Sequence, residues 1–159
     1  MFYIIFVFYF KFYINIIIMI NHVIPDFTII NALSAVAIAL VYITIFSLVK
    51  EPNRQKINAV IIAGAGAVYW SGGFGILEYL FATAMLFMAF KGLTNYKYIG
   101  FAWLMHTTWD TLHHLYGNPI VPFSASSSAG CAVCDSVLAL WFFYKAPSIF
   151  ELFNKKSIA

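Results

Sequence analysis

The chain has 159 residues, of which 63% are hydrophobic and 9% are charged. A typical soluble domain is about 45–50% apolar and about 25% charged, so this composition excludes an ordinary soluble domain. High hydrophobicity also excludes a disordered chain, and nine scattered Lys and Arg residues argue against a nucleic-acid-binding protein. We therefore expect an integral membrane protein whose main partner is membrane lipid.

The first expected span covers residues 1–20, which are mostly Ile, Phe and Tyr with Lys11 as the single charge. This stretch lacks the positive start and the small-residue cleavage site of a signal peptide. A second methionine, Met19, is an alternative start of the protein. The chain is therefore expected to have six spans, or five if residues 1–20 are not a true span.

The other spans are predicted from the lengths of the apolar runs, because about 20 apolar residues cross a bilayer as a helix. The run 57–90 is too long for one crossing, and a glycine-rich break at 71–75 divides it. None of these runs alternates apolar and polar residues, as the strands of a membrane barrel do. The expected fold class is therefore all-α, a polytopic transmembrane helical bundle that forms a single membrane domain. Its further spans are residues 29–49, 57–70, 75–90, 98–116 and 128–144.

Lys and Arg residues occur in every second loop, which predicts the orientation. Cytoplasmic loops carry an excess of Lys and Arg, so the basic loops and the C-terminus are expected in the cytoplasm. The basic segments are 50–56, 91–97 and the C-terminal tail, whereas the loops 21–28, 71–74 and 117–127 contain no Lys or Arg.

Three of the six acids and three of the four histidines lie inside the expected spans. Ionisable groups at membrane depth are costly and often mark functional sites. Successive side chains of a helix are rotated by about 100° around its axis. On the span 98–116 this rotation places the histidines and Asp110 within one arc about 100° wide. Imidazole and carboxylate groups are ligands of first-row metals. The predicted ligands of a divalent transition metal, zinc or iron, are His106, Asp110, His113 and His114.

The antiparallel order of the spans predicts that further reactive groups lie near this arc, in the outer half of the bilayer. Glu78 lies about one turn into its span and Asp135 about two turns into the last one, and either could be the general acid or base of a reaction. Cys131 and Cys134 form a Cys-x-x-Cys motif. That spacing suits a redox pair or additional metal ligands, and two small buried thiols are the structural alternative.

The leading functional hypothesis is a metal-dependent membrane enzyme that acts on a lipid or another apolar substrate, because a bound divalent ion can activate water. One alternative is a small transporter, or a proton or cation pathway, that uses the same buried groups. Another is a structural or partner-binding subunit with a polar core. A homo-oligomer is compatible with each of these hypotheses.

Three motifs resemble those of a family of small bacterial multi-pass membrane proteins of unknown function. The resemblance covers about residues 30–150 and implies a location in the bacterial inner (plasma) membrane. It implies no activity, because the family has none assigned. The motifs are Tyr69-Trp70-Ser71-Gly72-Gly73-Phe74-Gly75, the segment from Trp103 to Pro119 with its histidines and Asp110, and Cys131-x-x-Cys134-Asp135 with the following Ala139-Leu140-Trp141.

Overall fold

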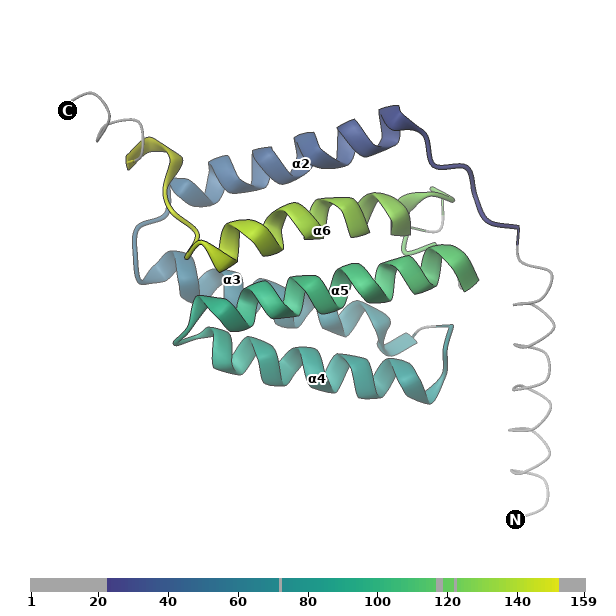
Figure 1. The fold of residues 1–159 in the computed structure, drawn as a ribbon. Coiled ribbons are helices and arrows are strands. Elements are labelled where there is room, and N and C mark those ends of the chain that lie inside the picture. The colour runs from purple at the N-terminus through teal and green to yellow at the C-terminus, as the bar shows by residue number, and fades with distance from the viewer. Residues whose placement is uncertain (1–22, 72, 117–118, 122, 152–159) are drawn as a thin grey trace, which may run out of the picture.

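The computed structural model describes residues 23–71, 73–116, 119–121 and 123–151, so the expected first span lies outside the described residues. All regular structure within these ranges is helical, which confirms the all-α fold class. The long helices lie side by side, with the connecting loops at the two ends of the bundle (Figure 1). The helices are α2 (Ile29–Ser47), α3 (Asn53–Ala67), the short 3₁₀ helix η1 (Val68–Ser71), α4 (Ile76–Gly92), α5 (Tyr96–Tyr116) and α6 (Ser127–Phe143).

The glycine-rich break predicted within residues 57–90 is a turn between two helices. η1 extends α3 as far as Ser71, and α4 begins at Ile76. Gly75 precedes α4 with a φ of 63°, a left-handed conformation that glycine adopts without the steric cost of a Cβ atom. The chain therefore reverses here, and α3 and α4 pack against each other.

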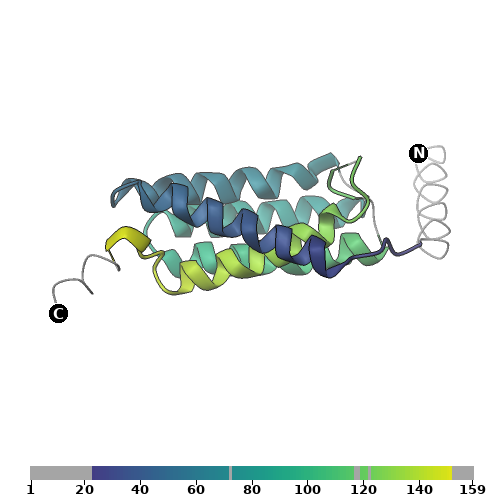
Figure 2. The ribbon, with the colours of Figure 1, turned by 90° about the horizontal axis from the view of Figure 1, so that it is seen from above.

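The helices approach closely where small residues lie between them. A Cβ atom on Gly66 would lie 2.5 Å from Met85 Cβ, so only glycine fits this contact between α3 and α4. α5 makes its largest contact with α6, and α2 packs mainly on α6 through small residues that include Ala35 and Ala39. Figure 1 shows α2 next to α6, and in Figure 2, seen from above, α2 crosses in front of α6. The pair α5–α6 forms the centre of the bundle, and α2 lies at its edge.

Polar groups lie inside this bundle and large apolar side chains lie on its surface. Glu78 and Asp110 are both 0% exposed, whereas many Ile, Leu, Val and Phe side chains of α2 and α4 are exposed. α2 is the one described helix that is both long and apolar enough to cross a membrane, and α6 is a shorter apolar helix. These two helices are a sign of membrane association.

Candidate functional site

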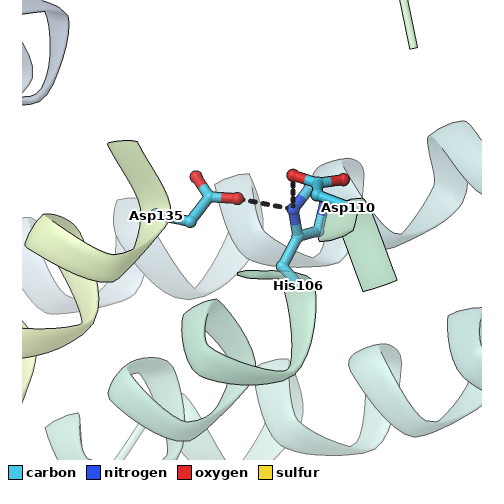
Figure 3. A group of neighbouring side chains, drawn as sticks. All are labelled: His106, Asp110 and Asp135. Carbon is cyan, nitrogen blue, oxygen red and sulfur yellow. Dashed lines mark hydrogen bonds and ion pairs between the residues drawn. The ribbon is translucent and has the colours of Figure 1, made fainter. Parts of the chain in front are cut away.

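A buried group of one histidine and two aspartates lies between α5 and α6. His106 occupies the middle of α5, Asp110 follows one helical turn later, and Asp135 lies in the middle of α6. His106 Nδ1 is 2.7 Å from Asp135 Oδ2 and 3.1 Å from Asp110 Oδ2 (Figure 3). The two carboxylates therefore converge on a single nitrogen atom of the imidazole.

Groups from α3 and η1 hold two members of this triad in place. The Tyr69 hydroxyl donates a hydrogen bond to Asp110 Oδ1, and His106 Nε2 lies 3.4 Å from the Ala65 carbonyl oxygen. The Tyr69 ring is 3% exposed and packs against the His106 ring at a centroid distance of 5.2 Å. Both ring nitrogens of His106 and the second carboxylate oxygen of Asp110, Oδ1, thus have polar partners within the bundle.

The chemistry of the triad suits a divalent cation. One ligand atom from each of its three residues lies within 4.8 Å of the others, and all three residues are buried. In the form that binds a metal, two ionised carboxylates and one neutral imidazole would carry a charge of −2, which a divalent ion would neutralise. Because a buried uncompensated charge is costly, this balance favours a divalent ion over a monovalent one. Three protein ligands would leave one coordination position open, as in catalytic zinc sites.

Glu78 and His113 form a second polar group, separate from the triad. Glu78 Oε1 lies 2.9 Å from His113 Nε2, and Glu78 Oε2 accepts a hydrogen bond of 2.8 Å from Trp109 Nε1. The backbone N–H of Phe74 also donates to Glu78 Oε1, at 3.2 Å. Glu78 therefore ties the start of α4 to α5 and to the preceding turn, as a capping glutamate does.

Tyr69 lies between the two groups, with its ring also packed against His113 at a centroid distance of 5.1 Å. The sequence predicts that Asp135 lies in the outer half of the bilayer with Glu78 and His113, and that His106 lies deeper. In the structure Asp135 contacts His106, because both residues occupy the middle of their helices. The single pocket expected from the sequence is thus divided into two hydrogen-bonded groups.

The remaining predicted site residues lie outside the triad. His114 is partly buried, and its ring faces the Phe27 ring edge to face. Cys131 and Cys134 are free thiols on α6. They belong to no group of possible metal ligands among the described residues. The predicted roles of His113, His114 and the two thiols as ligands stay predictions.

An open cavity of about 470 Å³ lies between α2 and the first half of α6. Both cysteines and Asp135 line it. Asp135 is therefore shared between the cavity and the triad, and it is the member of the triad that lines the cavity.

Tyr69 was not identified from the sequence as a partner of Asp110. The signal that could have found it is its place in the last turn before the glycine break, where its hydroxyl can reach a neighbouring helix.

Residues 30–148 match a family of unknown function, DUF6010. The chain belongs to this family. No curated protein and no solved structure matches the chain. The match confirms the expected membership in a family of unknown function over almost the same residues, and it assigns no activity.

Proposed function

We propose that this DUF6010 member is a multi-pass membrane protein that binds one divalent transition-metal ion, zinc or iron, through His106, Asp110 and Asp135. The main support is the convergence of two buried carboxylates on one imidazole nitrogen. The metal would activate water or polarise a carbonyl group of a lipid or another apolar substrate. Tyr69 would orient Asp110, because a ligand carboxylate needs a fixed hydrogen-bond partner.

The multi-pass arrangement is supported by the distribution of charge and by the lengths of the helices. The basic segments around Lys50, Lys91 and Lys145 lie at one end of the bundle, where the α2–α3 and α4–α5 loops and the end of α6 meet (Figure 1). The described parts of the opposite end contain no Lys or Arg. Helices of 17–21 residues, the lengths of α2, α4, α5 and α6, reach about 26–32 Å at 1.5 Å per residue, close to the hydrocarbon thickness. We place the basic end in the cytoplasm.

Metal content of the purified protein tests this proposal. We expect about one metal ion per chain, and we expect His106→Gln to lose it because the shared ligand nitrogen is removed. His113→Gln is the matched control, since it changes the second polar group and leaves the triad intact. Elemental analysis measures all three proteins. A wild-type protein without metal, or a His106→Gln variant that retains it, would contradict the proposal.

A proton or cation pathway is a second candidate function. It is favoured by the unbroken series of protonatable groups from Tyr69 through Asp110 and His106 to Asp135, which ends at the cavity. Such series of buried groups occur in proton-translocating membrane proteins. Acidification of liposomes that contain the protein measures this activity. Flux that is lost in Asp110→Asn, from a protein that binds no metal, would replace the enzyme hypothesis with this one.

A further inference from the structure

The cavity between α2 and α6 has one polar wall and one apolar wall. The α6 side contributes the hydroxyl groups of Ser126 and Ser127, the two thiols and Asp135. Asn31 of α2 donates a hydrogen bond of 3.0 Å to Ser126 at this end of the cavity. Hydroxyl and amide groups bind a ligand by hydrogen bonds and fix its orientation. The α6 wall is therefore suited to the polar end of a molecule.

The α2 wall is mainly apolar and continues onto the surface of the bundle. Phe27, Ile30, Ala35 and Ile38 line the cavity from this side. Ile30 is 76% exposed and Ile38 is 64% exposed, so the same side chains also belong to the outer face of α2. In a bilayer that face contacts lipid chains. An apolar tail can thus leave the cavity along α2, past Ser34, whose hydroxyl donates a hydrogen bond to the Ile30 carbonyl oxygen within the helix.

The charge of the cavity restricts the polar end of such a ligand. Asp135 is the only ionisable side chain besides the thiols, and the described lining contains no Lys, Arg or His. Phosphate groups are usually held by Arg or Lys. The N-terminal turn of α6, which begins at Ser127, supplies a partial charge of only about +0.5, which falls off within that turn. A full anionic charge beside Asp135 would therefore be poorly compensated.

We propose that this cavity binds a neutral amphiphile with a hydroxyl- or ester-bearing head and a single apolar chain, of the monoacylglycerol class. Its head contacts the serines and thiols of α6, and its chain follows Ile30 and Ile38 of α2. A volume of about 470 Å³ lies within the range of small-molecule sites, about 300–1,000 Å³. The role of this amphiphile as a substrate rests on the proposed function, whereas its binding to the cavity requires no metal.

The two cysteines make the cavity measurable. They are the only cysteines of the chain, and both line the cavity, so alkylation by N-ethylmaleimide reports on this site alone. The full chain is placed in lipid nanodiscs with 1-monoolein, or with 1-oleoyl-lysophosphatidate, which has the same chain and an anionic head. Monoolein at about four times its Kd leaves about one fifth of the sites free and should slow alkylation about fivefold. The lysophosphatidate should slow it much less.

Two glycine variants provide matched controls. A Cβ atom on Gly130 would meet no atom within 4 Å, and Gly130 lines the cavity, so Gly130→Leu extends an apolar side chain into it. Gly64 is exposed on α3 and also meets no atom, so Gly64→Leu makes the same change away from the cavity. We expect monoolein to have no effect on the alkylation of Gly130→Leu, and to protect Gly64→Leu as it does the wild type. Equal melting temperatures establish that both variants fold.

The outcomes separate this inference from the proposed metal site. Alkylation that monoolein does not slow, or that both lipids slow equally, would overturn the neutral-amphiphile site. If monoolein protects the thiols of a protein that binds no metal, the cavity binds the amphiphile, but the amphiphile is not the substrate of a metal enzyme. Gly130→Leu should keep its metal, because Gly130 lies outside the triad.

Discussion

Glu78→Ala is expected to lower the free energy of unfolding by about 3–5 kcal/mol, the cost of breaking a buried hydrogen-bonded charge group. The Glu78 side chain accepts hydrogen bonds from Phe74 N and Trp109 Nε1 and lies against His113 Nε2, and the residue is 0% exposed. Alanine would remove this acceptor from the buried His113 and from the half-buried Phe74 and Trp109 donors. Total stabilities are typically about 5–15 kcal/mol, so this loss would be a large fraction.

Equilibrium unfolding in detergent micelles measures this effect. Glu151→Ala is the control, because Glu151 is exposed and surface substitutions usually change stability by less than about 0.5 kcal/mol. We also expect Glu78→Ala to keep its metal under conditions where it is folded, since Glu78 is not a member of the triad. A stable Glu78→Ala protein would contradict the structural role. A stable protein that has lost activity would instead support the catalytic role predicted from the sequence.

Asp110→Asn and Asp135→Asn are each expected to weaken metal binding by about 100-fold or more. Loss of a residue that only hydrogen-bonds to a metal ligand already lowers metal affinity about 10–100-fold. These substitutions remove a charged ligand itself. Asparagine keeps the size of the side chain, so the bundle should remain folded. Competition with a chelator of known affinity measures the change.

Cys134→Ser is the matched control for Asp135→Asn. Cys134 is the neighbouring residue on α6 and lines the same cavity, but it is not in the triad. The serine variant should bind metal as the wild type does. The ligand assignment would be wrong if Cys134→Ser lost the metal and Asp135→Asn retained it.

The positions of the helices followed from the sequence because the length of an apolar run and a glycine break act locally. The break at 71–75 was predicted from the length of the run 57–90 and from its glycines, and η1 ends and α4 begins there. The inward face of α5 was also predictable, since His106, Asp110 and His113 share one arc of the helix and all three are buried.

The pairing of these groups was not predictable, because it depends on how far each helix is shifted along its neighbours. The sequence grouped His113 with His106 and assigned Asp135 to acid–base chemistry. In the structure Asp135 approaches His106 and Glu78 approaches His113. Tyr69 intervenes between the two histidine rings, a contact that its place before the glycine break allows but does not specify.

X-ray absorption at the metal edge of the loaded protein tests the central claim most directly, because it identifies the atoms bound to the metal. The triad predicts nitrogen and oxygen ligands at about 2.0–2.2 Å, with the scattering of one imidazole and no sulfur. This spectrum should be the same in Cys134→Ser and should be lost in His106→Gln. A sulfur shell at about 2.3 Å would assign the metal to Cys131 and Cys134 instead, and a protein that cannot be loaded would leave the triad as a hydrogen-bonded core.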